Sequence, residues 1–105
     1  MPLVVYVEDQ NHERMAKTHE DHKGTFLSLC EAAPEGSILR AVNRYGDTMF
    51  NEIQLVRFVA ELNELPPEKR NSTVRKLAAA AEFAIASHGY LFFVGEPFEP
   101  RSVTV

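Results

Sequence analysis

Three of the chain's four histidines lie within residues 12–22, in the stretch HERMAKTHEDH, with carboxylates between them. Imidazole and carboxylate groups bind zinc, so the stretch is a candidate metal site. On a helix, however, His12 and His19 would be separated by a rise of about 10.5 Å, too far for two ligands that each lie about 2 Å from one ion. Only His19 and His22 could share an ion, and they would need further ligands from elsewhere. We therefore expect no bound metal or other cofactor, with a site at His19 and His22 as the alternative.

A second candidate is the polar series Asp47, Asn51 and Gln54, which fall at i, i+4 and i+7 and would line one side of a helix. These side chains could form a small polar pocket at a helix N-terminus, where free amides bind anions. The carboxylate of Asp47 would itself occupy those amides and repel an anion. The pattern therefore favours a helix cap at Asp47 or Thr48 over a pocket.

The remaining charged groups do not form a recognisable catalytic set. Lys69, Arg70, Arg75 and Lys76 make a basic cluster, which is typical of a solubilising surface or of a docking patch for an acidic partner. His88 is predicted to be buried or to cap the end of its helix. The sequence contains no Ser-His-Asp pattern and no glycine-rich phosphate loop, which favours a protein that is not an enzyme. The alternative is a small enzyme or metal-binding protein that uses the histidines or the polar pocket.

Length and charge exclude several classes of partner. A chain of 105 residues, 45% of them hydrophobic, fits one domain over 1–105, and its net charge of −4 gives no attraction to nucleic acid or to anionic membranes. No apolar run approaches the roughly 20 residues of a membrane helix, and the run at 3–7 is too short for a signal-peptide core. We expect a cytoplasmic protein in which Cys30, the only cysteine, is a small buried apolar residue.

The first half of the chain predicts two strands and a short helix. Residues 2–8, PLVVYVE, are rich in β-branched residues and predict a strand. Residues 9–23 lack an apolar stripe, which predicts a polar loop or a solvated helix. Apolar residues at i, i+3, i+4 and i+7 then predict a helix over 26–33, and residues 38–45 predict a second strand.

The second half predicts two long helices and a last strand. One amphipathic pattern spans 49–65, and another continues to Gly89, which is well placed to end its helix. That second helix starts either with Pro67 in its first turn or with Ser72 as its cap. Residues 90–95, YLFFVG, predict the third strand.

The order of these elements is β-α-β-α-α-β, followed by a tail at 96–105. We expect a two-layer α+β domain, because two amphipathic helices must bury their apolar stripes against a sheet. It would contain a small sheet of about three strands, two long antiparallel helices on one face and a short extra helix.

Three stretches together carry a resemblance to known sequences: YGDTMFNEIQ at residues 45–54, a helix ending in AELNEL, and LFFVGE at residues 91–96. The combination resembles a family of short uncharacterised bacterial proteins with a YGDTxFN turn-helix motif and a C-terminal strand that ends in FVGD or FVGE. The resemblance spans residues 38–96. It implies the fold given above and no activity, and it does not include the histidine stretch.

The predicted strands are apolar on both faces. In the last strand Tyr90, Phe92 and Val94 point away from the equally apolar residues between them. One face packs on the helices, so the other needs a cover, of which the helix over 26–33 can supply only part. We predict a homodimer that buries Tyr90, Phe92 and Val94, with the tail or residues 9–23 folding over this face as the alternative. Such a protein is a small interaction domain that binds itself or another protein.

Overall fold

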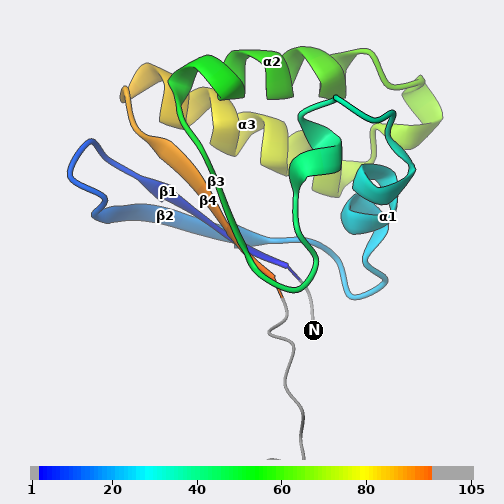
Figure 1. The fold of residues 1–105 in the computed structure, drawn as a ribbon, viewed down its shortest axis with the longest axis horizontal. Helices are drawn as coiled ribbons and strands as arrows, with labels where there is room; N and C mark the ends of the chain where they lie inside the picture. The colour runs from blue at the N-terminus through cyan, green and yellow to red at the C-terminus, as the bar shows by residue number, and fades with distance from the viewer. Residues whose placement is uncertain (1–2, 96–105) are drawn as a thin grey trace, which may run out of the picture.

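In the computed structural model, which describes residues 3–95, a four-stranded antiparallel sheet carries three α-helices on one face (Figure 1). The strands lie in the order β2-β1-β4-β3, with bounds β1 Val4–Glu8, β2 Arg14–His19, β3 Asp47–Phe50 and β4 Tyr90–Val94. The helices are α1 Thr25–Ala32, α2 Glu52–Asn63 and α3 Ser72–Ala86, with short 3-10 turns η1 Leu39–Ala41 and η2 Pro67–Lys69. The α+β class is confirmed, but the sheet has four strands where about three were predicted.

The fourth strand comes from residues 9–23, so the predicted polar loop or solvated helix is wrong. β2 pairs with β1 in an antiparallel hairpin, with Tyr6 opposite Lys17. Asp9 closes the turn, because its carboxylate accepts hydrogen bonds from the backbone amides of Asn11 and Glu13 at 2.8 and 2.9 Å. β2 is an edge strand whose side chains are mostly exposed, which explains why it needs no apolar stripe.

The strand predicted at 38–45 is also wrong. This segment forms η1 and a loop, and its apolar residues Leu39 and Val42 are buried from an irregular backbone instead of a strand. The strand lies just beyond, in β3, which pairs with β4. Because Asp47–Phe50 is used in the sheet, α2 begins at Glu52, three residues after the predicted start.

The start of α3 is fixed by a side chain, and a glycine lies just beyond its end. Pro67 lies in η2 and not in the first turn of α3. The cap of α3 is Asn71, whose side chain accepts a hydrogen bond of 2.9 Å from the amide of Val74, so neither predicted start is correct. Ser72 is the first helical residue. After the helix, Gly89 lets β4 approach β1, because a Cβ atom there would lie 2.0 Å from the carbonyl oxygen of Glu8.

The core lies between the helices and the inner face of the sheet. Its centre is four phenylalanines whose ring centroids lie 5.4 to 6.2 Å apart: Phe26, Phe50, Phe58 and Phe93. Cys30 is buried beside them, as predicted. Through Phe26, α1 packs on the same side as the long helices and therefore does not cover the second face of the sheet, contrary to the prediction.

No helix within residues 3–95 is long and apolar enough to cross a bilayer. The tail at 96–105 lies outside the described residues.

Candidate functional site

The four histidines lie at separate places in the fold. His12 has a positive φ of 64° in the hairpin turn, and its Nδ1 lies 3.1 Å from a carboxylate oxygen of Glu8. His19 ends β2 with its Nδ1 2.9 Å from the carbonyl oxygen of Glu20, and His22 is exposed in the turn before α1. Within residues 3–95 no group of three or more His, Cys, Asp or Glu side chains is arranged to hold a metal ion.

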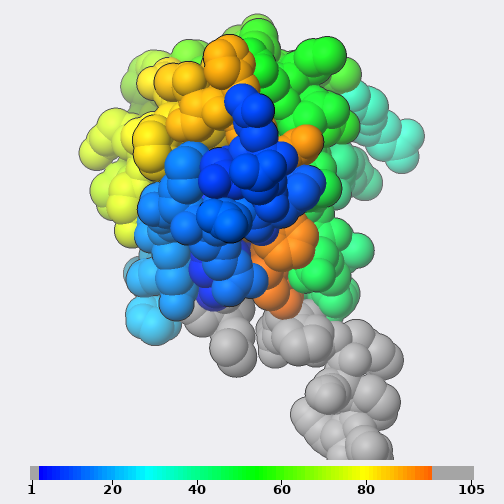
Figure 2. All heavy atoms as spheres, turned by 90° about the vertical axis from the view of Figure 1, so that its left-hand side faces the viewer, coloured from blue at the N-terminus to red at the C-terminus, as the bar shows by residue number. Residues whose placement is uncertain are grey.

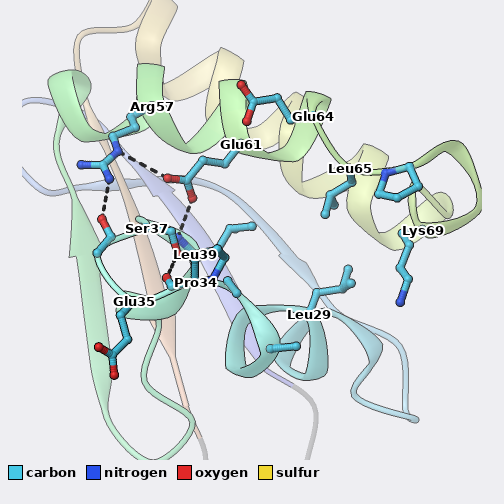
Figure 3. Close-up of a pocket in the computed structure, with 14 residues that line it drawn as sticks. Leu29, Pro34, Glu35, Ser37, Leu39, Arg57, Glu61, Glu64, Leu65 and Lys69 are labelled. Atoms are coloured by element: carbon cyan, nitrogen blue, oxygen red, sulfur yellow. Dashed lines mark hydrogen bonds and ion pairs between the residues drawn. The ribbon is translucent and has the colours of Figure 1, made fainter.

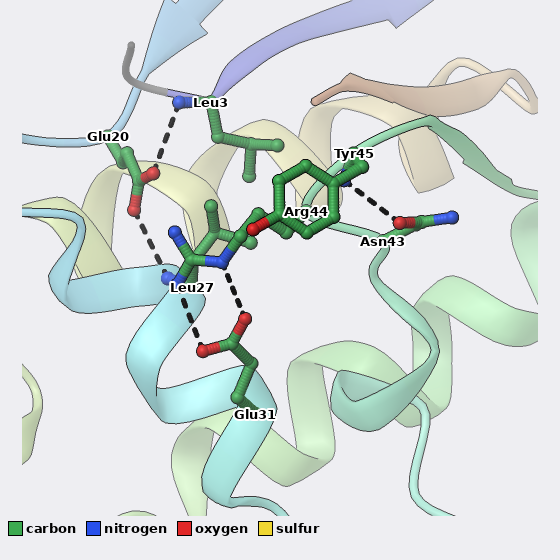
Figure 4. Close-up of polar contacts among 7 residues, drawn as sticks. All are labelled: Leu3, Glu20, Leu27, Glu31, Asn43, Arg44 and Tyr45. Carbon is green, nitrogen blue, oxygen red and sulfur yellow. Dashed lines mark hydrogen bonds and ion pairs between the residues drawn. The ribbon is translucent and has the colours of Figure 1, made fainter. Parts of the chain in front are cut away.

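The acidic residues beside those histidines organise the start of α1, and Figure 4 shows the contacts of the first of them, Glu20. Glu20 is only 1% exposed, and its two carboxylate oxygens accept hydrogen bonds of 3.1 Å from the backbone amides of Leu3 and Leu27. Asp21 accepts from the amide and the hydroxyl of Thr25 at 3.1 and 2.6 Å, and these bonds lower the pKa of Asp21. The sequence analysis missed this role, although an acidic pair shortly before an apolar stripe is a signal for a helix start.

His88 is neither buried nor helical, which corrects the prediction. It is exposed, has a φ of 56°, and lies just beyond α3. Its Nδ1 lies 3.1 Å from a carboxylate oxygen of Glu52 in the first turn of α2. This contact joins the end of α3 to the start of α2, as expected for antiparallel neighbours.

The polar series forms a cap and not a pocket. Asn51 accepts a hydrogen bond of 3.0 Å from the amide of Gln54, and the Gln54 side chain accepts one of 2.9 Å from the amide of Asn51. This reciprocal pair is a capping box at the start of α2. The predicted caps, Asp47 and Thr48, lie in β3 instead, so that prediction is wrong.

A surface ion pair ties α1 to the loop before β3 (Figure 4). Arg44 donates to both carboxylate oxygens of Glu31, at 2.6 and 2.9 Å. The hydrogen bond from Arg44 lowers the pKa of Glu31. The pair is partly exposed, so it orders the loop more than it stabilises the fold.

The basic cluster does not form one patch. Arg75 donates to the carbonyl oxygen of Arg70 at 2.7 Å. Lys69 lines a groove beside α2, whereas Lys76 faces a second hollow between α3 and β2. The four basic side chains therefore do not share one binding surface.

The second face of the sheet carries the interface residues predicted from the sequence. Tyr90, Phe92 and Val94 are half-buried and alternate with the buried residues of β4. Two cross-strand rows on this face, read from β2 to β3, are His19, Val4, Val94, Asp47 and Lys17, Tyr6, Phe92, Met49. A third row, Arg14, Glu8 and Tyr90, does not reach β3. Apolar side chains thus cross the middle of the face, with cations along the β2 edge and a carboxylate on the β3 edge. We call this surface the open face.

The hairpin covers part of the open face with its own polar side chains. The guanidinium of Arg14 lies 3.8 Å from the centre of the Tyr6 ring, and the His12 ring stacks on Tyr90 with centroids 4.4 Å apart. Figure 2 shows the hairpin in blue beside β4 in orange. Phe92 and Met49 receive no such cover from described residues, and Met49 is 44% exposed.

A groove of about 610 Å³ lies between α1 and the second half of α2 (Figure 3). Its walls are held by Glu61, whose carboxylate accepts hydrogen bonds of 2.9 Å from the amides of Ile38 and Leu39. Arg57 joins the same carboxylate at 3.3 Å and donates to the carbonyl oxygen of Gly36. The sequence analysis missed the groove, because it predicted a strand over 38–45, where η1 lies.

The single thiol lies away from these surfaces. Cys30 is 1% exposed, and burial, with a smaller contribution from the charge of Glu20, raises its pKa well above the ordinary value for a thiol. A thiol with a raised pKa is a poor nucleophile, because the thiolate is the reactive form. Cys30 therefore serves the core.

Comparison of the chain with protein-family models, with curated proteins and with solved structures found no match.

Proposed function

We propose that the protein is a small non-enzymatic interaction domain of the cytoplasm that works as a homodimer through the open face. The observation that carries this proposal is the apolar strip across the centre of the sheet, with Phe92 flanked by Tyr6 and Met49 on a face that no described helix covers. Solvent-facing positions of an antiparallel sheet are normally polar. An apolar strip at such positions gains free energy when a second surface removes it from water.

A second copy fits the open face because the face is self-complementary. A two-fold axis parallel to the strands, between β1 and β4, would bring β2 of one protomer over β3 of its partner. Val4 would then face Val94 of the partner subunit, and His19 at the β2 edge would face Asp47 of the partner subunit. Sheets that pack face to face keep their strands roughly aligned, and an interface of two identical patches is the usual arrangement of a homodimer.

The described part of the chain covers the open face only in part. Residues 14–19 lie at the sheet edge as β2 and not over the open face, so this part of the predicted alternative is wrong. Arg14 and His12 cover only the aromatic rings of Tyr6 and Tyr90. Among residues 3–95, no segment covers the apolar centre of the face.

Light scattering coupled to size-exclusion chromatography tests the proposal. The expected mass is about twice the chain mass of 11.9 kDa, and Phe92→Lys should reduce it toward that of one chain because it places a charge in the apolar interface. Ile53→Lys is the matched control, since Ile53 is 82% exposed on α2 and away from the sheet. A wild-type mass of 11.9 kDa, or equal effects of the two substitutions, would contradict the homodimer.

A further inference from the structure

The groove between α1 and α2 lies on the helix side of the molecule. Its floor and walls include the apolar side chains of Leu29, Leu39, Leu65 and Pro66. Its volume of about 610 Å³ lies within the range of natural ligand pockets. The groove is separate from the open face, so a ligand can bind it whether or not the protein is a dimer.

Side-chain hydrogen bonds, not helix packing alone, set the shape of this groove. The carboxylate of Glu61 holds the start of η1, and Arg57 connects that carboxylate to the turn at Gly36. On the opposite side Arg40 donates to the carbonyl oxygen of Ala33 at 2.8 Å, which fixes the end of α1. A surface held in this way loses little conformational entropy when a partner binds.

The charge around the groove favours a cation. Three carboxylates and two cations line it, which leaves an excess of one negative charge: Glu35, Glu61, Glu64, Arg57 and Lys69. Arg57 is already paired with Glu61. α1 and α2 both end at the groove, and the C-terminus of a helix carries a partial negative charge. Among residues 3–95, the carboxylates of Glu35 and Glu64 have no hydrogen-bond or ion-pair partner, so both are available to a cation.

The open shape of the groove favours a segment of a protein over a free small molecule. Its rim residues Glu35, Glu64 and Lys69 are exposed, so the groove contacts a ligand from one side. A small molecule binds well when most of its surface is enclosed. A peptide segment can bind in such a groove because the rest of the partner adds contacts outside it.

We propose that this groove binds a segment of a partner protein in which an apolar side chain stands next to lysine or arginine. The apolar side chain lies between Leu29 and Leu65, and the basic side chain interacts with Glu35 or Glu64. The proposed ligand is therefore a basic amphipathic peptide segment.

A peptide-display library selected on the immobilised full-length chain tests the inference without knowledge of the natural partner. The expected outcome is enrichment of peptides with adjacent apolar and basic residues. Amide chemical shifts should then change at Leu29, Gly36 and Leu65 when such a peptide is added. No enrichment, enrichment of acidic peptides, or shift changes confined to the open face would each overturn the proposal.

Charge substitutions on the rim provide the second measurement. Glu64→Lys should weaken binding of a selected peptide about threefold, and Lys69→Glu should strengthen it by a similar factor, as expected for exposed ion pairs. Both residues are exposed, so neither change threatens folding. Glu82→Lys is the matched control, because Glu82 is an exposed carboxylate on α3 that does not line the groove. Equal weakening by Glu64→Lys and Glu82→Lys would mean attraction to net charge alone and would overturn the site.

Discussion

Glu20 shows how a single residue can look like a metal ligand in the sequence and serve the backbone in the structure. It stands between His19 and His22, yet its carboxylate lies inside the protein and accepts the amides of Leu3 and Leu27. These contacts attach the first strand to the start of α1. A buried carboxylate with both oxygens satisfied by backbone amides is not free to bind an ion.

Glu20→Gln should destabilise the fold by about 1–3 kcal/mol, because the amide NH2 of glutamine would face a backbone amide that needs an acceptor. Urea denaturation of wild type and variant measures the difference. Glu31→Gln is the matched control, since Glu31 forms an ion pair with Arg44 on the surface. Loss of that ion pair should lower the free energy of unfolding by less than about 1 kcal/mol. Similar losses for the two variants would contradict the structural role of Glu20.

Asp21 should make the stability of the protein depend on acid. Hydrogen bonds from Thr25 lower its pKa in the folded state, so its contribution is present above its ordinary pKa of 3.8 and is lost as the pH falls through the lower folded value. The free energy of unfolding should therefore fall more steeply with acid in the wild type than in Asp21→Asn. Asp47→Asn, which removes an exposed carboxylate without a described hydrogen bond, should keep the steep wild-type slope. Parallel curves for wild type and Asp21→Asn would contradict the prediction.

At the scale of elements, apolar patterns located the structure wherever an element buries a continuous stripe. α1, α2, α3, β1 and β4 were all predicted, because each packs a regular set of apolar residues into the core. The two errors have a common cause. β2 is an exposed edge strand held by pairing with β1, and the segment 38–45 buries Leu39 and Val42 from an irregular backbone held by Glu61. The structure of both segments depends on contacts with residues distant in the sequence. The local pattern of apolar residues carries no information about such contacts.

The start of α2 gives a test at this scale. Asn51→Ala should cost about 1 kcal/mol of unfolding free energy, because it removes the acceptor for the amide of Gln54 and breaks the capping box. Asp47→Ala should cost only a few tenths of that, since its side chain is exposed in β3. Thermal denaturation followed by circular dichroism measures both. A larger loss for Asp47→Ala would restore the cap predicted from the sequence.

At the scale of the whole molecule, the sequence predicted the open face better than the groove. Strict alternation in β4 places Tyr90, Phe92 and Val94 on one face whatever the strand order, so their grouping follows from the period of a strand. The groove depends on Arg57, Glu61 and the turn before η1, which are brought together only when α2 packs beside α1 and η1. Its lining residues come from separate segments of the chain and form no motif.

The proposed two-fold arrangement predicts a charge rescue. In that dimer the β2 edge faces the β3 edge of the partner, and Lys17 lies one cross-strand row away from Asp47 of the partner subunit. Asp47→Lys should weaken the dimer about twofold by placing like charges near each other, and Lys17→Glu should do the same. The double variant should regain affinity because opposite charges are then neighbours again. Analytical ultracentrifugation over a range of concentrations measures the dissociation constants, and Glu82→Lys combined with Lys17→Glu is the control that should not rescue. Additive losses in the Asp47→Lys, Lys17→Glu variant would rule out this packing, even if the protein is a dimer.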